Sequence, residues 1–392
     1  MPEYRYLVVG GGMTGDSACR GIRDHDPDGS IGLVGSEAHP PYVRPPLSKA
    51  LWKGKPEDSI WRGTAELGVE LHVGRTVESL DLARRVAVDD RGETYGYERL
   101  LLATGGTPRR LPGAPDGVLY YRTLDDFRRL RDLAREGVRA AVIGGGFIGS
   151  EIAAALSTNG CSVTMLFPEE GIGARLFPAE LALYVNEYYR EQGVEVLAEE
   201  LVSSIARTGD GFRVETDGGR TLHVDAVVAG LGIVPTTGLA EAAGLEVDDG
   251  VLVDDHGRAG GREEVFAAGD VARFPVAALD GTRRVEHEDH ANTHGRVVGS
   301  NMAGADTPYD HVPFFYSDLF ELGYEAVGDV DSRLETIAEW EELGRKGVVC
   351  YLAEGKPRGF LLWDAWGKVD AARELIAAGA PVDAGSLREL LA

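Results

Sequence analysis

The chain contains two copies of a pattern in which an apolar strand runs into a glycine-rich turn and then into the start of a helix. The glycines of the two copies are Gly10, Gly12, Gly15, Gly144, Gly146 and Gly149. The first glycine permits a tight turn, the second lets backbone N–H groups approach a pyrophosphate, and the third brings the helix against its strand. The helix N-terminus then favours anions through its unpaired N–H groups and its dipole.

A carboxylate follows the next apolar run in each copy, Glu37 after IGLV and Glu169 after CSVTMLF. A carboxylate at this place accepts both hydroxyls of a ribose and repels a 2′-phosphate. The sequence therefore predicts two bound adenine dinucleotides, neither of them NADP. A single glycine turn also closes ordinary strand-to-helix connections, and Glu169, which follows Phe167 and Pro168, has the alternative of being a solvated loop acid.

Composition limits the class of protein. The 392 residues are 43% hydrophobic, which is enough for two or three domains, and the formal charge of -24 disfavours nucleic acid as a partner. No apolar run reaches the roughly 18–20 residues of a membrane span, and the first strand begins at Tyr4, so we expect a cytoplasmic chain without a membrane span. Three scattered cysteines form no CxxC or CxxxxC pair, which excludes a redox-active dithiol.

The two halves resemble each other in plan, which suggests that one nucleotide-binding unit is inserted within another. The segment EEVFAAGDVARF, read as a strand, a turn at Gly269 and Asp270 and then a helix, completes the first unit. From about Asp306 the chain reads as strands, a hairpin at Glu354 and Gly355 and a closing helix over KVDAARELIAAGA. The predicted domains are 1–115 and 239–305 for the first unit, 116–238 for the second, and 306–392 for the C-terminal module. The predicted fold class is α/β: two nested Rossmann-like units with a C-terminal α+β module.

Longer motifs are more specific than the glycine turns. They are GGGMTG, RPPLSK, ATGGTPR, GGGFIGSE, AAGDV, LFPEEG, RRVEHEDHA, FYSDL, and the pair KGVVCYL and GFLLWD. With them nearly the whole chain resembles the two-dinucleotide-binding-domain flavoproteins, in the branch of apoptosis-inducing factor and the ferredoxin reductases. The resemblance implies FAD in the first unit, NADH in the second, and the C-terminal module at the flavin. Departures are the short turn EELGR in place of a long insert, Tyr316 where tryptophan is usual, and Glu288 where mitochondrial members have histidine.

The resemblance implies a catalytic pair, in which Lys49 lies beside flavin N5 and Glu151, on the first turn of the NAD helix, holds its ammonium. A lysine there stabilises the negative charge that develops on a reduced isoalloxazine. The alternative is that neither residue acts in catalysis. Lys49 would then be a surface residue, and Glu151 an acid favoured by the helix dipole.

The resemblance also implies the cofactor-binding residues. Those for FAD are Gly10, Gly12, Gly15, Glu37, Arg44, Lys49, Ala103, Thr104, Gly105, Arg109, Gly269, Asp270, Glu286, His287 and Tyr316. Those for NAD are Gly144, Gly146, Phe147, Ile148, Gly149, Glu151, Glu169 and Gly232. Ordinary packing is the alternative for Phe147 and Tyr316. Spacing alone also allows Glu286, His287, His290 and His294 to share a helix face as metal ligands, but we favour a flavin-facing helix and assign no metal.

These expectations combine into an NADH-dependent FAD oxidoreductase similar to apoptosis-inducing factor, with hydride transfer from NADH to FAD and an unknown acceptor such as oxygen, a quinone or an iron–sulfur protein. The first alternative is a ferredoxin or rubredoxin reductase, for which Arg283 and Arg284 are candidate docking residues on an otherwise acidic chain. The second is a redox-gated interaction protein whose turnover is incidental and whose NADH-bound form docks a partner. A homodimer is a candidate assembly.

Overall fold

The computed structural model describes residues 1–391, and by their contacts these divide into two compact units. Unit 1 comprises residues 1–44, 57–107 and 234–313, and unit 2 comprises residues 45–56, 108–233 and 314 onward. The division of the chain into three domains stays a prediction. Each unit contains one of the two glycine turns, and each is described separately below.

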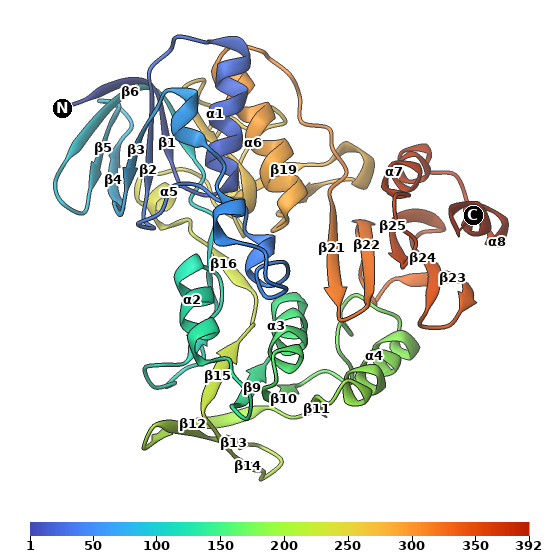
Figure 1. Cartoon of the computed structure of the whole chain (residues 1–392). Helices are drawn as coiled ribbons and strands as arrows, with labels where there is room; N and C mark the ends of the chain where they lie inside the picture. The colour runs from blue at the N-terminus through green and yellow to red at the C-terminus, as the bar shows by residue number, and fades with distance from the viewer. Residues whose placement is uncertain (392) are drawn as a thin grey trace. The chain divides into compact units, whose positions relative to one another are not determined.

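Unit 1 is built on a mixed sheet (Figure 1). Its parallel strands, in spatial order, are β3 (Val69–Val73), β2 (Ile31–Gly35), β1 (Glu3–Val9), β6 (Thr94–Leu102) and β18 (Val265–Ala267). The antiparallel strands β5 (Val86–Asp89) and β4 (Val77–Asp81) extend from β6. Because β18 pairs with β6, the predicted completion of the first unit by the segment EEVFA is confirmed.

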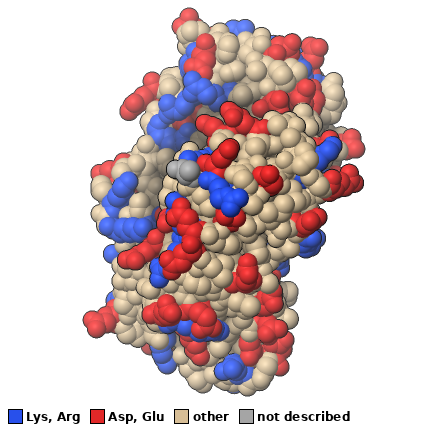
Figure 2. Space-filling model, turned by 90° about the vertical axis from the view of Figure 1, so that its right-hand side faces the viewer, with Lys and Arg blue, Asp and Glu red and all other residues tan. Residues whose placement is uncertain are grey.

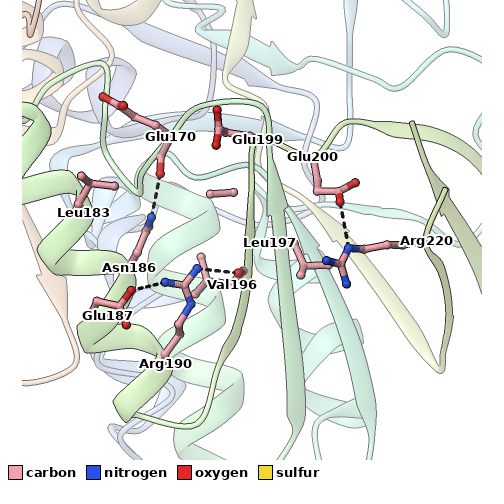
Figure 3. A pocket seen from close by; sticks show the side chains of 11 residues that line it. Glu170, Leu183, Asn186, Glu187, Arg190, Val196, Leu197, Glu199, Glu200 and Arg220 are labelled. Atoms are coloured by element: carbon pink, nitrogen blue, oxygen red, sulfur yellow. Dashed lines mark hydrogen bonds and ion pairs between the residues drawn. The ribbon is translucent and has the colours of Figure 1, made fainter. Parts of the chain in front are cut away.

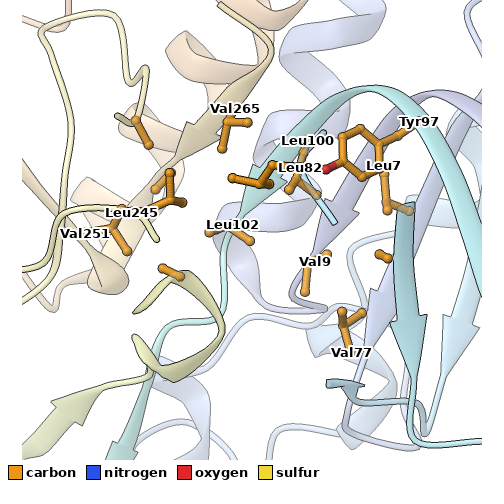
Figure 4. Close-up of a cluster of buried hydrophobic side chains, with 14 of the residues drawn as sticks. Leu7, Val9, Val77, Leu82, Tyr97, Leu100, Leu102, Leu245, Val251 and Val265 are labelled. Carbon is orange, nitrogen blue, oxygen red and sulfur yellow. The ribbon is translucent and has the colours of Figure 1, made fainter. Parts of the chain in front are cut away.

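Alternate residues of the unit 1 strands enter two different cores, as a sheet covered on both faces requires. Leu7 and Val9 lie in a cluster with Leu100, Leu102 and Val265 (Figure 4). The residues between them, such as Tyr6 and Val8, pack instead against α1 (Met13–His25) and α6 (Glu288–Met302). These two helices approach closely, since a Cβ on Gly299 would lie 2.1 Å from the carbonyl oxygen of Ala18.

Smaller elements complete unit 1. They are α5 (Gly238–Ala242), the 3-10 helices η2 (Glu57–Ile60), η3 (Thr64–Leu67), η4 (Gly269–Val271) and η5 (Ala277–Leu279), and a three-stranded sheet of β17 (Val251–Leu252), β19 (Ala272–Pro275) and β20 (Thr282–Arg283). The helix predicted after Gly269 and Asp270 is therefore wrong. Gly269 and Asp270 themselves form the short 3-10 helix η4, and the next residues, Ala272–Pro275, are extended and pair with β17 and β20.

Unit 2 contains a parallel sheet whose strands, in order, are β11 (Glu195–Ala198), β10 (Ser162–Phe167), β9 (Arg139–Ile143), β15 (Ala226–Ala229) and β8 (Leu119–Tyr120). Its helices are α2 (Leu124–Leu133), α3 (Phe147–Thr158) and α4 (Ala179–Glu191). An antiparallel sheet of β12 (Val202–Thr208), β13 (Gly211–Thr216) and β14 (Thr221–Val224) follows β11. The segment 45–56 contains η1 (Pro45–Leu47), and the residues that follow it, 48–54, form a series of turns.

The C-terminal module of unit 2 is an antiparallel sheet with helices. Its strands, in order, are β21 (Phe314–Leu319), β22 (Leu322–Gly328), β25 (Lys356–Trp363), β24 (Lys346–Ala353) and β23 (Glu335–Glu342). The helices are α7 (Val369–Ala378), which packs on β22 and β25, and α8 (Ala384–Leu391), which packs on β23 and β24. The predicted hairpin at Glu354 and Gly355 is confirmed, but the helix predicted to close the chain, α7, is followed by α8.

Two short strands, β7 (Gly106–Pro108) and β16 (Ile233–Pro235), lie where the chain passes between the units. With two parallel-sheet units and a strand-rich module, the predicted α/β class is confirmed. Within residues 1–391, no helix has the length and the apolar character that crossing a bilayer requires.

Candidate functional site

The first glycine turn has the geometry that its sequence predicts. Gly10 follows β1 with a φ of 133°, and a Cβ on it would lie 2.0 Å from the carbonyl oxygen of Ala103. A Cβ on Gly15 would lie 2.1 Å from the carbonyl oxygen of Gly10, so α1 packs directly on the turn. Gly12, the N-cap of α1, has no atom within 4 Å of the place of a Cβ, and no side chain caps the helix. The turn therefore leaves open space beside uncapped N–H groups, where a phosphate fits.

Glu37, predicted to bind a ribose, lies two residues after β2 and already has two partners in unit 1. Its carboxylate accepts from the Tyr42 hydroxyl at 2.6 Å and from the Arg44 guanidinium at 2.5 Å. The Arg44 guanidinium carbon also lies 5.1 Å from the centre of the Tyr42 ring. Two residues that the sequence analysis assigned separately are thus one ion pair, and this pair places Glu37 firmly at the carboxyl end of β2.

The remaining residues predicted to bind FAD in unit 1 gather at the carboxyl ends of β6 and β18. Ala103, Thr104 and Gly105 follow β6, and the Thr104 hydroxyl donates to the carbonyl of Thr236 at 2.8 Å. Gly269 has a φ of 73°, and a Cβ on it would clash with Thr14 of α1. β6 pairs with β1 and β18 pairs with β6, all in parallel, so both segments lie at the same edge of the sheet as the glycine turn.

The four residues considered as metal ligands do not share one helix face. Glu286 and His287 precede α6, with His287 as its N-cap residue and Glu286 paired with Arg284 at 2.6 Å. His290 and His294 are buried inside the unit and contact each other through ring nitrogens 3.3 Å apart. Desolvation lowers the pKa of His287 to about 4 and that of His290 to about 3. Both imidazoles are therefore neutral near pH 7.

The second glycine turn repeats the first in unit 2. Gly144 has a φ of 113°, and a Cβ on Gly149 would lie 1.9 Å from the carbonyl oxygen of Gly144. Gly146, the N-cap of α3, is exposed and has nothing within 4 Å of the place of a Cβ, and no side chain caps α3. Phe147 and Ile148 form the half-buried start of α3. Both turns thus have open space beside an uncapped helix N-terminus, and this space fits the pyrophosphate of a dinucleotide.

Lys49 and Glu151, predicted as a catalytic pair, form a salt bridge in unit 2, with side chains that are 11% and 5% exposed. Glu151 lies just past the first turn of α3 rather than on it, so capping by the helix dipole does not explain it. Its Oε1 accepts from the Lys49 ammonium and, at 2.6 Å, from the Ser317 hydroxyl, while its Oε2 accepts from the Ser48 hydroxyl at 2.5 Å. Because a buried ion pair stabilises only when its remaining lone pairs have partners, this carboxylate is well supported.

Aromatic side chains of β21 approach the same end of α3. The Lys49 ammonium lies 5.5 Å from the centre of the Tyr316 ring, within the range of a cation–π contact. The rings of Phe147 and Phe315 meet edge to face with centres 5.0 Å apart. The structure thus brings Lys49, Glu151, Phe147 and Tyr316 together, as the sequence analysis predicted for residues about the nicotinamide and flavin rings.

Other residues predicted to bind a dinucleotide occupy strand ends of unit 2. The Arg109 backbone N–H donates to the carbonyl of Gly232 at 2.9 Å, while the Arg109 residue itself is exposed. Glu169 follows β10 and pairs with the exposed Arg175 at 2.6 Å. The Arg175 side chain is 84% exposed, whereas Arg44, the partner of Glu37, is 25% exposed.

A pocket of about 370 Å³ is lined by residues of α4 and β11 and by Glu170, the residue after Glu169 (Figure 3). Four of its charged residues form two pairs within the lining, Arg190 with Glu187 at 2.5 Å and Arg220 with Glu200 at 3.0 Å. Asn186 uses both ends of its amide on the backbone of residues 170 and 172. The pocket lining is therefore largely satisfied by itself, and it contains none of the residues predicted to bind cofactors.

Charged side chains of both signs alternate over the surface that Figure 2 shows. The two arginines considered as docking residues have partners within the protein. Arg284 has a side chain that is only 10% exposed and pairs with Asp249 and Glu286. Arg283 donates to the backbone carbonyls of Leu279, Asp280 and Thr282. Arg284 is therefore wrong as a source of surface charge.

Sequence reasoning missed three members of the Lys49 environment. Ser48 stands inside the RPPLSK motif and Ser317 inside FYSDL, so the motifs contained the signal although we assigned neither serine a role. Tyr324 is paired with Ser317 across β21 and β22, and its hydroxyl interacts with Ser317. Burial, together with the charge of Glu151, raises the pKa of Tyr324 well above its ordinary value, so this phenol keeps its proton.

Known proteins resemble the chain over nearly all of its length. Residues 4–295 match the family described as pyridine nucleotide-disulphide oxidoreductase, and residues 298–345 match the C-terminal region of mitochondrion-associated apoptosis-inducing factor. Apoptosis-inducing factor 1 of Dictyostelium discoideum is 34% identical, over 95% of this chain and 78% of that protein. The ferredoxin–NAD(+) reductase component of the anthranilate 1,2-dioxygenase system of Burkholderia cepacia is 35% identical, over 98% and 97%. A crystal structure of a covalent putidaredoxin reductase–putidaredoxin complex aligns with a TM-score of 0.92 at 29% identity, over 99% of this chain and 96% of that one.

Proposed function

Because the chain belongs to the pyridine nucleotide-disulphide oxidoreductase family, we propose that it is an NADH-dependent FAD oxidoreductase whose physiological role is to pass electrons from NADH to a separate acceptor. FAD and NAD(H) are the cofactors of this family, and the open space beside Gly12 and Gly146 fits the pyrophosphate of each. All three cysteines are buried and unpaired, so electrons leave the flavin without a protein dithiol.

The observation that carries the proposal is the enclosed Lys49–Glu151 pair at the start of α3. When bound, the flavin accepts a hydride from NADH, and this redox chemistry belongs to the cofactor. The protein places a lysine charge held by one carboxylate in a site with little water, where a charge acts more strongly than in bulk solvent. The charge of Lys49 therefore favours the reduced, more negative state of a flavin bound beside it.

Mixing the purified FAD-loaded protein with NADH under anaerobic conditions tests this function. We expect the absorbance of oxidised flavin to bleach at saturating NADH, and bleaching by NADPH to be much slower because Glu169 at the second turn suits a free ribose. A flavin that stays oxidised with saturating NADH would refute the proposal.

Replacement of the lysine tests its role. Lys49→Met keeps the length of the side chain but removes its charge, and we expect hydride transfer to slow by about 10²-fold, as for the loss of one preorganised electrostatic contact. Stopped-flow reduction by NADH measures the change. An unchanged reduction rate would remove Lys49 from the mechanism.

The acceptor defines two candidate functions. Similarity to apoptosis-inducing factor in both the main and the C-terminal region supports an oxidoreductase of that type. Similarity of equal extent to ferredoxin reductases supports transfer to an iron–sulfur protein. A steady-state comparison of oxygen, quinones, ferricyanide and a ferredoxin separates them, since turnover with the ferredoxin far above that with quinones would favour the second candidate.

The remaining assignments are also proposals. We propose that the protein acts in the cytoplasm, that nucleic acid is not among its partners because of its charge of -24, and that a homodimer is its first candidate assembly. Sedimentation with and without NADH tests whether reduction controls assembly. Identical behaviour in both states would count against a redox-gated interaction protein.

A further inference from the structure

We propose that Ser317, with Tyr324 behind it, is a positioning residue that fixes the Glu151 carboxylate and through it the ammonium of Lys49. The inference rests on the proposed role of Lys49 in electron transfer. It assigns a task to the C-terminal module, because Ser317 belongs to β21 and Tyr324 to β22.

Ser317 has no surface exposure, and its hydroxyl donates to Glu151 Oε1 at 2.6 Å. The same oxygen receives the Lys49 ammonium, while Oε2 receives Ser48. Both oxygens of the carboxylate are therefore held, which sets its rotation about the last side-chain bond. Without Ser317 only Ser48 and the lysine itself would define that rotation, so the position of the ammonium would become less certain.

Tyr324 gives the Ser317 hydroxyl a direction. The two residues are register partners on antiparallel strands, so their side chains share one face of the sheet. The Tyr324 hydroxyl interacts with Ser317, and because its pKa is raised it stays protonated and can donate. With the tyrosine donating to its oxygen, the serine has its own proton left for Glu151. This order forms a two-hydroxyl chain that ends on the carboxylate.

The rings around Tyr324 hold this chain still. Tyr324 stacks on Trp363 with ring centres 5.7 Å apart and an interplanar angle of 5°. Phe177 meets both rings edge to face, at 5.1 Å from Tyr324 and 5.3 Å from Trp363. All three side chains are buried. A hydroxyl anchored in such packing has few alternative orientations, which is the property that a positioning group requires.

Two variants of Ser317, studied in the FAD-loaded protein, test the proposal. Ser317→Ala removes the hydroxyl, and Ser317→Cys fills a similar space with a weak donor. We expect both to slow reduction by NADH about tenfold and to lower the midpoint potential of the bound flavin, because a loosely held lysine charge stabilises the reduced state less. Tyr324→Phe should shift the potential in the same direction by a smaller amount.

Tyr351→Phe is the matched control, because it removes one buried hydroxyl of the same module that donates to the carbonyl of Leu176 and not to Glu151. It should lose stability without changing the flavin potential. A wild-type potential in Ser317→Cys would show that Ser317 only fills space and would overturn the inference. If Lys49→Met lowers the potential but neither Ser317 variant does, the inference fails and the proposed function stands. If none of the variants shifts it, the role of Lys49 itself fails.

Discussion

At the residue scale, Asp16 of α1 is a buried charge whose partners come from separate segments of unit 1. Its carboxylate has no surface exposure and accepts from Arg20 at 2.9 Å, Arg62 at 2.5 Å and Thr64 at 2.7 Å. Asp16→Ala would leave two arginines near the core without their partner, so we expect the free energy of unfolding to fall by about 3 kcal/mol. Urea denaturation measures this loss. Asp225→Ala, which breaks an exposed pair with Arg139, is the control and should cost much less.

The same residue predicts a dependence on pH. Burial acts to raise the pKa of Asp16, but hydrogen bonds from Arg20 and Thr64 and the charge and hydrogen bond of Arg62 outweigh burial and hold the pKa below its usual value. A carboxylate whose pKa is lowered by folding stabilises the protein above its unfolded pKa of about 3.9, and this contribution is lost as the pH falls further. The stability difference between wild type and Asp16→Asn should therefore be constant above about pH 5 and shrink below about pH 4. A difference that grows on acidification would contradict this account.

Residues also show what sequence can and cannot supply. Lys49 and Glu151 stand in motifs, so their pairing could be predicted although they are 102 positions apart. Ser317 is 166 positions from Glu151 and reaches it only through the register of β21 against β22 and the packing of β21 on α3. The motif FYSDL contains this serine, but nothing within the motif indicates that the serine contacts Glu151. The ion pair of Glu37 with Arg44 was missed for a different reason. Each residue was assigned to FAD separately, and a contact between the two was not considered.

At the element scale, the second and third glycines of each turn have different tasks. The second leaves space for a ligand, and the third lets the helix pack against the turn. Gly146→Ala meets no atom within 4 Å, so we expect only a small loss of stability but at least tenfold weaker binding of NADH, because the new methyl group occupies the space that a pyrophosphate needs. Gly149→Ala would push into the carbonyl of Gly144 and should destabilise the protein by about 2 kcal/mol.

Titration calorimetry with NAD⁺ and thermal unfolding distinguish these two effects. Gly12→Ala is the matched control in the other turn, and it should reduce the FAD content of the purified protein while leaving NAD⁺ affinity unchanged. If Gly146→Ala binds NAD⁺ as the wild type does, the second turn does not hold the pyrophosphate.

Elements with a strong period were predictable, and elements defined by distant pairing were not. The strand and the helix start on either side of each glycine turn agree with the structure because apolar spacing and the glycines define them. After Gly269 the sequence VARF contains helix-compatible residues, yet Ala272–Pro275 is extended because β17 and β20 offer it hydrogen bonds. Tertiary pairing thus outweighed local propensity.

At the scale of the whole molecule, net charge controls which redox proteins can meet this one quickly. The chain carries 64 acidic and 40 basic side chains other than histidine. Arg284, which we considered as a docking residue, forms ion pairs with Asp249 and Glu286. An acidic ferredoxin would therefore be repelled at long range, and the repulsion weakens as salt screens it. Fast reduction of an acidic ferredoxin would therefore require a local patch of positive charge on this acidic protein.

Salt dependence of ferredoxin reduction consequently separates general repulsion from specific docking. We expect the second-order rate constant with an acidic ferredoxin to rise between about 0.01 M and 0.15 M ionic strength, over which the Debye length falls from about 30 Å to about 8 Å. An uncharged quinone is the control and should show no such rise. A rate constant that falls with salt would contradict the expectation, because it would reveal an attractive patch that the overall charge conceals, and it would favour ferredoxin as the physiological acceptor.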